Sequence, residues 1–265
     1  MLAAVWHGPN DLRLENRPLP KVLPGTVLIK VEACAICGSD LRIMGDGNSR
    51  INPPHILGHE IAGEIVELGQ GVKNFSVGDK VAYSAVPLGA YSTHRIFKTK
   101  SLVKVPDEID LTLAATLMTK GLTTFYLLYK TYPVSSGQTI LFHAAAGGVG
   151  QIFCQWAKSL GVKVIGTVGS DEKINIAKQN GCDEVINYSK DDFAKKVMDI
   201  TNGKGVPVVY DGVGKSTFEN SVKCLETRGM MISFGNASGA LDPINVPKTL
   251  QPKGIFFVRP SMGQY

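Results

Sequence analysis

The pattern of hydrophobic and polar positions divides the chain into two parts with different periods. In the first part, β-branched runs that partly alternate, at residues 26–32 and 60–67, lie between glycine-rich turns. Such runs predict the strands of a small β domain. From about residue 136 onward, short apolar runs alternate with stretches of helical period. Strands that alternate with helices predict an α/β fold with a parallel, doubly wound sheet.

The second part contains enough apolar runs for a complete sheet of this kind. Six strands are predicted, at residues 139–143, 162–168, 184–187, 206–211, 229–234 and 255–258. Helical patterns over 151–160 and 172–179 lie between the first three of them, and Gly161 stands where glycine commonly ends a helix. A further helical stretch, 111–130, is expected to join the two parts and to pack into a core.

The composition is that of an ordinary globular protein. Of the 265 residues, 44% are hydrophobic and 19% are charged, which argues against a disordered chain and a disulfide miniprotein. The formal net charge of +5 is not gathered into a basic block, so no nucleic acid partner is expected. No run of 18 apolar residues and no signal peptide occurs, which predicts a cytoplasmic protein without a membrane span. The five cysteines are then expected to be free thiols or ligands.

A glycine-rich segment, AAGGVG at residues 145–150, follows a predicted strand and opens a predicted helix. It matches the dinucleotide-binding fingerprint, with alanine in place of the first glycine. Gly147 would let the backbone approach the pyrophosphate, and Gly150 would let helix and strand pack closely. The helix N-terminus would then face the phosphates. This context makes a merely structural glycine turn the weaker interpretation.

The end of the next predicted strand indicates which nicotinamide is bound. In NAD-binding folds an acidic residue ends this strand and holds the ribose 2′-hydroxyl, but here the strand ends TVGS at 167–170. Asp171 and Glu172 come later, at a helix start, where the helix dipole favours acids in any case. Ser170 and Lys173 can instead bind and neutralise a 2′-phosphate, which favours NADP(H). The alternative for Lys173 is a solvated helix surface.

A second set of chemically capable residues lies in the first part, in the sequences CGSD and GHE. Cys37 and His59 are typical zinc ligands, and Asp40 or Glu60 can support such ligands by hydrogen bonds. A catalytic zinc needs three protein ligands, and only two are convincing here. Cys34 forms a Cys-x-x-Cys pair with Cys37, which leaves open a redox pair or half a zinc knuckle. Cys34 can equally be a small buried apolar residue.

The remaining histidines, His7, His55, His94 and His143, stand alone in the sequence and are expected to be structural. Neither a Gly-x-Ser-x-Gly nor a His-Glu-x-x-His motif occurs. Hydrolase chemistry therefore has no support.

Taken together, these residues resemble the medium-chain dehydrogenase/reductase superfamily. From about residue 87 to the end the chain is similar to bacterial NADPH:quinone reductases of the zeta-crystallin type. The matching segments are LGAYS (88–92), KGLTT (120–124), FHAAAGGVG (142–150), QWAK (155–158), IGTVG (165–169), VINY (185–188), VYD (209–211), SFGN (233–236) and RPS (259–261). Residues 1–84 instead resemble the zinc-dependent alcohol, polyol and threonine dehydrogenases, through CGSD and GHE.

The resemblance implies two domains and an assembly. A GroES-like β-barrel catalytic domain would span 1–112, and a Rossmann dinucleotide-binding domain would span 113–265. Relatives continue for several tens of residues in a segment that completes the first domain, so this domain is expected to be incomplete. The last strand, 255–258, would form a sheet edge, and edges of this kind pair in relatives, which predicts a homodimer.

The resemblance also implies roles for individual residues. Cys37 and His59 match the first two catalytic zinc ligands, and Ser39 matches a proton-relay hydroxyl. The third ligand would fall near Lys120, whose charge repels a cation, and a four-cysteine zinc lobe is absent, so zinc is not expected. Cofactor contacts are expected at the pyrophosphate, the 2′-phosphate and the nicotinamide, from Thr124, Gly147, Gly148, Val149, Gly169, Ser170, Lys173, Tyr188, Val213, Phe234, Gly235 and Asn236.

Three functions remain open at this stage. The leading one is a zinc-independent NADPH:quinone reductase, which transfers hydride to a quinone or conjugated carbonyl while the protein orients the reactants. Ser39 or a water would supply the proton. The second is a zinc-dependent alcohol dehydrogenase, in which the metal polarises the alcohol oxygen. The third is a protein that binds NADPH without turnover.

Overall fold

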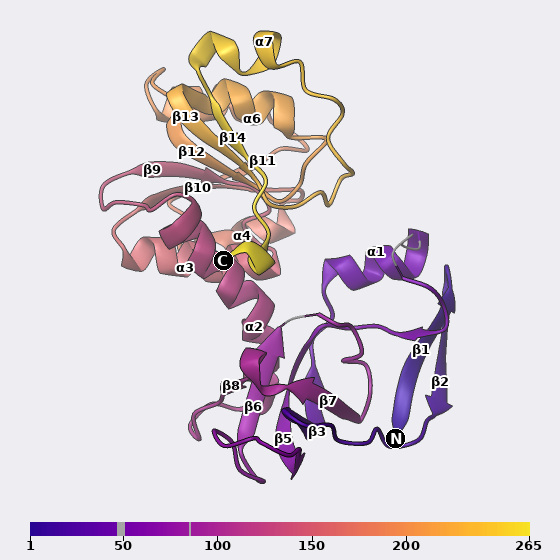
Figure 1. Cartoon of the computed structure of the whole chain (residues 1–265). Helices are drawn as coiled ribbons and strands as arrows, with labels where there is room; N and C mark the ends of the chain where they lie inside the picture. Colours follow the sequence, from indigo (N-terminus) through magenta and orange to yellow (C-terminus); the bar gives the residue numbers. More distant parts are fainter. Residues whose placement is uncertain (47–50, 85) are drawn as a thin grey trace. The chain divides into compact units, whose positions relative to one another are not determined.

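The computed structural model describes residues 1–46, 51–84 and 86–265 (Figure 1). The chain forms two compact units, Met1–Thr119 and Lys120–Tyr265. The division falls inside one helix, α2 (Leu111–Tyr126), and the predicted boundary after residue 112 lies in the same helix. Each unit has its own hydrophobic core.

The second unit, all of whose residues are described, is built on a six-stranded parallel sheet in the order β11-β10-β9-β12-β13-β14. The chain enters at β9, winds outward to β11, then crosses to β12 and winds out to β14. The point where the winding reverses lies between β9 and β12, which is where such sheets bind ligands. The strands are β9 (Thr139–Phe142), β10 (Lys163–Val168), β11 (Glu184–Asn187), β12 (Val206–Asp211), β13 (Leu225–Ser233) and β14 (Phe256–Val258).

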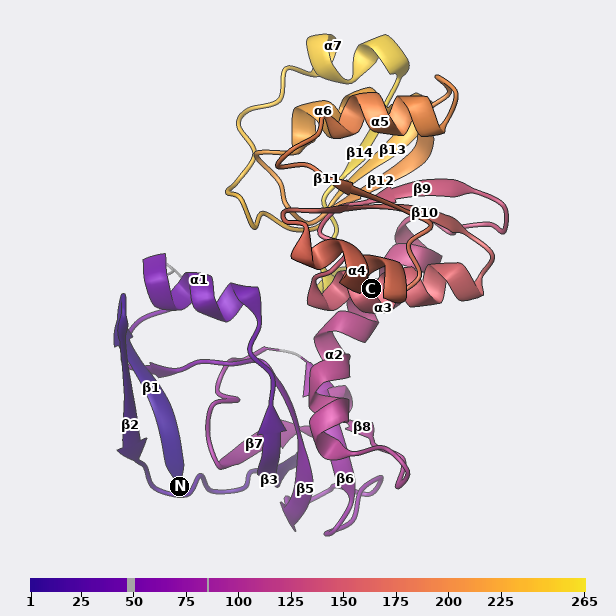
Figure 2. The same ribbon diagram turned by 180° about the vertical axis from the view of Figure 1, so that it is seen from behind.

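Helices cover both faces of this sheet (Figure 2). Successive strand residues point to opposite faces, so Ile140 and Phe142 pack with α3 and α4, while Leu141 packs with α5 and α6. Burial on both faces explains why these strands read as continuous apolar runs. The helices are α3 (Gly148–Ser159), α4 (Glu172–Gln179), α5 (Phe193–Ile200), α6 (Phe218–Cys224) and α7 (Val246–Thr249), with short 3₁₀ turns at Gln251–Lys253 and Met262–Gln264. The predicted doubly wound α/β fold is confirmed.

One helical segment, Leu111–Thr131, consists of α2 and a π-helical turn, Leu127–Thr131. By length and composition it could cross a membrane, although the sequence analysis expected no such segment, and 39% of the tested window is buried. Ala114 and Ala115 pack in a core of the first unit, whereas Leu127 and Leu128 pack in a core of the second. Core helices meet the same criterion, so the segment alone does not indicate a membrane protein.

The first unit contains two antiparallel sheets among its described residues, in the orders β7-β3-β5-β6-β8 and β2-β1-β4. Its main core includes Ile29, Ile65, Tyr83 and Phe97, and the rings of Tyr83 and Phe97 stack with centroids 3.7 Å apart. The elements are β1 (Leu2–Gly8), β2 (Asp11–Asn16), β3 (Thr26–Cys34), α1 (Gly38–Asp46), β4 (His55–Ile56), β5 (Glu60–Leu68), β6 (Lys80–Ser84), β7 (His94–Lys98), a 3₁₀ turn (Thr99–Ser101) and β8 (Val103–Lys104).

Candidate functional site

The glycine-rich loop leads from β9 into α3, and its shape depends on glycine. A Cβ at Gly150 would lie 2.5 Å from the carbonyl oxygens of both Ala144 and Ala145, so no other residue fits there without a backbone shift. Gly147 is the N-cap of α3 and offers no side-chain cap. The first backbone N–H groups of α3 therefore have no side-chain acceptor from the cap, and a phosphate is the ligand that suits such a helix end.

Helix α2 brings two further groups to the Rossmann unit. The Lys120 side chain runs along the backbone of Gly148, where a Cβ would lie 2.9 Å from Lys120 Cε. The hydroxyl of Thr124 is fully buried and has no hydrogen-bond partner within the described parts of the chain. A buried hydroxyl without a partner costs free energy, so this position suits a ligand that supplies the missing hydrogen bond.

The carboxylate that follows β10 is neutralised by its neighbours. Lys190 forms an ion pair with Asp171, and Asn187 Nδ2 donates to Asp171 Oδ1 over 2.7 Å. The hydrogen bonds from Lys190 and Asn187 lower the pKa of Asp171. Asp171 is therefore already paired with Lys190 and Asn187. It is also the acidic group nearest to the end of β10, where NAD-binding folds hold the ribose.

The turn after β10 depends on a glycine, at residue 169. A Cβ at Gly169 would lie 2.8 Å from the Tyr188 hydroxyl, so glycine allows the tyrosine to approach the backbone. Ser170 is half-buried and Lys173 is exposed at the start of α4. These neighbouring segments carry the Ser170 hydroxyl, the Tyr188 phenol and the Lys173 ammonium group. Together, these groups form a surface that suits an anion.

A third loop of the Rossmann unit is held by a buried carboxylate. Asp211 ends β12, and its Oδ1 accepts hydrogen bonds from the backbone N–H groups of Val213 (2.8 Å) and Gly214 (2.9 Å). The backbone carbonyl of Asp211 accepts from the N–H of Phe234 over 2.9 Å. The loops that follow β12 and β13 are thereby joined, and they contain the residues predicted to contact the nicotinamide.

Arg259, which follows β14, also holds the loop after β13 in place. Its guanidinium donates to the carbonyl oxygens of Ser233 (2.9 Å) and Gly235 (2.7 Å) and to Asn236 Oδ1 (2.5 Å). The sequence analysis used RPS only as a matching segment and missed this role. The sequence signal for this role of Arg259 is its position directly after the last strand, opposite a glycine turn.

A buried network beneath these loops contains the most enclosed histidine. His143 Nδ1 and Nε2 each lie 2.8 Å from a hydroxyl oxygen, of Thr167 and Ser221 respectively. Ser221 Oγ lies 3.3 Å from Asp211 Oδ2, which also accepts from Thr217 over 2.8 Å. Complete burial lowers the pKa of His143, so the ring is neutral. As expected from the sequence, this histidine is structural.

The first unit contains a different arrangement, around Cys37, which directly precedes α1. Asp40 is fully buried, and its Oδ1 lies 3.3 Å from His59 Nδ1. Its other oxygen accepts from the Tyr91 hydroxyl (2.9 Å) and from the Cys37 backbone N–H (3.1 Å). The hydroxyl and the backbone N–H of Ser39 lower the pKa of the Cys37 thiol. Asp40 therefore fixes the imidazole beside the thiol.

This arrangement favours a positive charge on His59 and a negative charge on Cys37. Hydrogen bonding to Asp40, and then to Cys37, raises the pKa of His59 to about 10. Burial raises the pKa of Cys37, but hydrogen bonds from His59 and Ser39 outweigh it and leave the pKa below its usual range. Cys34 has the opposite shift, because burial and the charges of nearby carboxylates raise its pKa. All five cysteines are free thiols.

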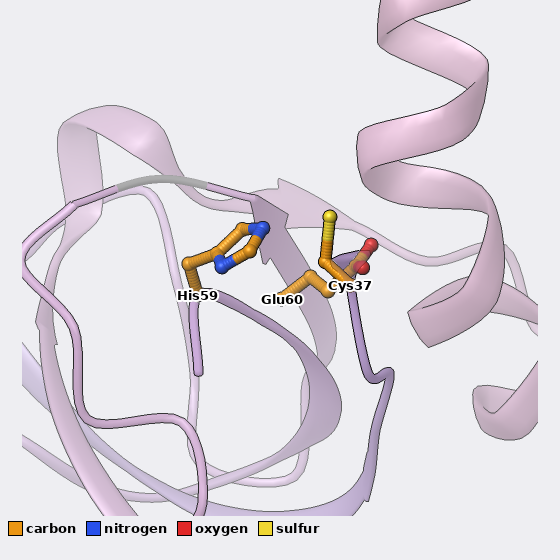
Figure 3. Close-up of side chains that lie close together, drawn as sticks. All are labelled: Cys37, His59 and Glu60. Atoms are coloured by element: carbon orange, nitrogen blue, oxygen red, sulfur yellow. The ribbon is translucent and has the colours of Figure 1, made fainter. Parts of the chain in front are cut away.

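Cys37, His59 and Glu60 also lie close enough to hold a metal ion (Figure 3). One ligand atom from each lies within 4.8 Å of the other two. Asp40 binds His59 Nδ1 and leaves Nε2 for a metal, which is the common support for a histidine ligand. A thiolate, an imidazole and a carboxylate form a donor set that suits zinc.

Glu60 is the member of this cluster that the sequence analysis assigned only a supporting role. Consecutive residues of a regular strand point to opposite faces, which would separate the side chains of His59 and Glu60. However, His59 precedes β5 and follows Gly58, whose φ of +83° turns the chain sharply. The Thr119 N–H donates to Glu60 Oε2 over 3.2 Å and helps to fix the carboxylate.

Two family models match the chain. Residues 23–107 match the alcohol dehydrogenase GroES-like domain, which confirms the predicted fold of the first unit. Residues 148–263 match the zinc-binding dehydrogenase family.

Individual relatives are similar over almost the whole chain. The quinone oxidoreductase of Pseudomonas aeruginosa is 51% identical over 99% of this chain and 81% of its own length. The 2-haloacrylate reductase of a Burkholderia species is 47% identical over 100% of this chain and 82% of its own. The crystal structure of Escherichia coli quinone oxidoreductase complexed with NADPH is 39% identical, with a TM-score of 0.97, over 100% of this chain and 82% of its own. The chain belongs to the quinone oxidoreductases of the medium-chain dehydrogenase/reductase superfamily.

Proposed function

We propose that this protein is an NADPH-dependent reductase of quinones or of other conjugated carbonyl compounds, and that it works without zinc. The observation that carries the proposal is the phosphate-binding geometry at the N-terminus of α3, where glycine is required at residue 150. When bound, NADPH supplies the hydride from C4 of its nicotinamide. The relatives named above reduce a quinone in one case and a 2-haloacrylate in another.

The choice of NADPH over NADH rests on the turn after β10. Ser170, Lys173 and Tyr188 would hold the 2′-phosphate through hydroxyl and ammonium groups. Asp171, which could otherwise bind a ribose 2′-hydroxyl, is already paired with Lys190. Gly148 and Val149 would donate backbone hydrogen bonds to the pyrophosphate.

The nicotinamide end would be positioned by groups that are already fixed. Thr124 has a buried hydroxyl available for the carboxamide. Val213, Phe234 and the loop at 235–236 would line the ring, held by Asp211 and Arg259. These residues bind and orient, and they exclude water from the reacting atoms.

The first unit would supply the proton. Ser39 and the protonated His59 both act on the Cys37 thiol and lower its pKa. These three groups therefore keep a transferable proton next to the Ser39 hydroxyl. A quinone accepts hydride without strong polarisation of its carbonyl, so this chemistry does not require a metal.

The test is a titration with NADPH and with NADH, followed by addition of 1,4-benzoquinone with and without a chelator. We expect tighter NADPH binding and chelator-resistant oxidation at the nicotinamide absorbance band. Ser170→Asp combined with Lys173→Ala should reverse the cofactor preference, with Lys195→Ala as the control at an exposed lysine of α5. NADPH binding without oxidation would favour a non-catalytic binding protein instead.

A second candidate function, a zinc-dependent alcohol dehydrogenase, is favoured by the cluster of Cys37, His59 and Glu60. These residues would hold the ion, and Asp40 would orient the imidazole. Zinc there would act as a Lewis acid on an alcohol oxygen. Stoichiometric zinc in the purified protein, together with loss of activity on chelation, would establish this function and contradict the first.

We further propose that the protein is a cytoplasmic homodimer that pairs along β14. This strand is at the edge of the parallel sheet, and Phe256 is 53% exposed. Sheet edges invite pairing with a second chain. A monomer in sedimentation at micromolar concentration would contradict the dimer.

A further inference from the structure

The first unit contains a cavity of about 720 Å³ beside Ser39 and His59. Its described lining comes entirely from this unit and includes Arg42, Asn52 and His55. The rest of the described lining is aliphatic side chains and a proline. The cavity therefore combines an apolar wall with a small number of polar groups, as small-molecule sites commonly do.

Helix α1 presents one face to this cavity. Ser39, Arg42 and Ile43 all line it, at spacings of three and four residues, which is the spacing of neighbours on one helix face. The Arg42 guanidinium thus shares the cavity with the Ser39 hydroxyl. The Arg42 side chain is exposed, so an incoming molecule can reach it.

The charges around the cavity have one sign. No aspartate or glutamate is among the described residues that line it, and Arg42 is permanently positive. Asp40 lies next to Ser39 in the sequence but is fully buried and bonded to His59 and Tyr91. A quinone is neutral and offers the guanidinium only single carbonyl acceptors. A carboxylate does, because its two oxygens match the guanidinium fork.

We propose that the preferred acceptor is a conjugated carbonyl compound that carries a carboxylate, and that Arg42 selects it by pairing with that group. This inference rests on the reductase function proposed above. Hydride from NADPH forms the new C–H bond at the β-carbon, and the electron pair of the C=C bond moves to the α-carbon. The α-carbon takes a proton through the Ser39 hydroxyl, which leaves a saturated carboxylate and NADP⁺.

The experiment compares trans-4-oxo-2-pentenoate with its methyl ester, which lacks the negative charge and carries one more methyl group, with NADPH as the reductant. We expect kcat/KM for the acid to exceed that for the ester. Arg42→Gln should lower this acid-to-ester ratio by about tenfold or more, mainly through KM, because a charge-assisted hydrogen bond is lost. Arg42→Lys should restore part of the ratio, since a point charge remains.

Arg13→Gln is the matched control, because Arg13 lies on β2, pairs with Asp11 and does not line the cavity. It should leave the ratio unchanged. A ratio near one in the unaltered protein, or an equal fall in Arg13→Gln and Arg42→Gln, would overturn the inference.

A parallel measurement does not depend on reduction of the probe. Calorimetry with the saturated acid 4-oxopentanoate and its methyl ester should show tighter binding of the acid, and Arg42→Gln should remove the difference. Reduction of 1,4-benzoquinone tests the underlying function separately. If benzoquinone is reduced but acid and ester bind equally, the carboxylate inference is wrong and the reductase function stands. If NADPH is not oxidised by any acceptor, the reductase function itself has failed.

Discussion

The two units each hold a histidine near an aspartate, but the two histidines have opposite charge states. In the Rossmann unit, His143 is enclosed and neutral, and both ring nitrogens meet hydroxyl oxygens. In the first unit, His59 is partly exposed and protonated beside Asp40 and Cys37. The arrangement around His143 is enclosed on all sides, so it can only hold loops in place. The second arrangement, around His59, is charged and borders a cavity, which suits the proton transfer proposed above.

The largest effect is expected from breaking the closed network. Asp211→Ala would leave the N–H groups of Val213 and Gly214 buried without their acceptor, and the Thr217 hydroxyl with only one of its two acceptors. We expect a loss of about 2–6 kcal/mol in the free energy of unfolding, measured with urea, because each buried N–H left without an acceptor costs about 1–3 kcal/mol. The control is Asp242→Ala, which removes an exposed partner of Lys215 and should cost less than about 1 kcal/mol. Equal costs would show that the network is not a stabilising element.

A smaller effect is expected at the cofactor loop. Gly150→Ala places a Cβ 2.5 Å from two backbone carbonyls and should cost about 1–3 kcal/mol, with loss of NADPH binding. Gly121, inside α2, has open space around it, so Gly121→Ala should stabilise by roughly 0.5–1 kcal/mol. Thermal unfolding with and without NADPH measures both. Opposite signs for the two substitutions are the expected result.

The pH dependence of stability should separate the two histidines. The pKa of His59 is raised to about 10 from 6.5, so its contribution is complete below pH 6.5 and is lost as the pH rises through about 10. Burial lowers the pKa of His143 from 6.5, so its contribution is present above pH 6.5 and is lost as the pH falls through the folded-state pKa. Urea midpoints across this range measure both slopes.

Two substitutions show which histidine causes each slope. His59→Gln should flatten the curve between pH 6.5 and about 10 and leave the acid side as it was. His143→Gln should flatten only the acid side, even if it lowers stability throughout. A curve that changes on the same side in both variants would contradict the contrast between the two sites.

The smallest effect concerns the two thiols of the first unit. Cys34 is the more exposed of the two, but its pKa is raised by burial and nearby carboxylates. The pKa of Cys37 is lowered by His59 and Ser39, so iodoacetamide at neutral pH should modify Cys37 faster. Peptide mass spectrometry over time gives both rates, and His59→Gln should reverse their order. Faster modification of Cys34 in the unaltered protein would show that exposure outweighs the charge of His59.

The sequence predicted the Rossmann unit better than the first unit, for a physical reason. Strands buried on both faces are continuous apolar runs, so their positions and the glycine loop between β9 and α3 were visible. The exception is β13, which begins at Leu225 rather than at residue 229. Arg228 within this strand has a φ of +63°, and this irregularity interrupts the pattern on which the prediction relied.

The candidate site of the first unit depends on contacts between distant segments, which a periodic pattern does not contain. Cys37 and His59 could be named from their residue types. The partnership of Asp40 with Tyr91, and the approach of Glu60 to Cys37, required the folded chain. Arg259 was missed for the same reason, because its role is a contact with a loop that follows another strand.

We propose that the chain transfers hydride from NADPH without a metal. The most direct test is a single turnover, in which protein dialysed against a chelator and loaded with NADPH is mixed rapidly with 1,4-benzoquinone. We expect the nicotinamide absorbance to decay at the same rate as in undialysed protein and more slowly with NADH in place of NADPH. A reaction that disappears on dialysis and returns with zinc would contradict it.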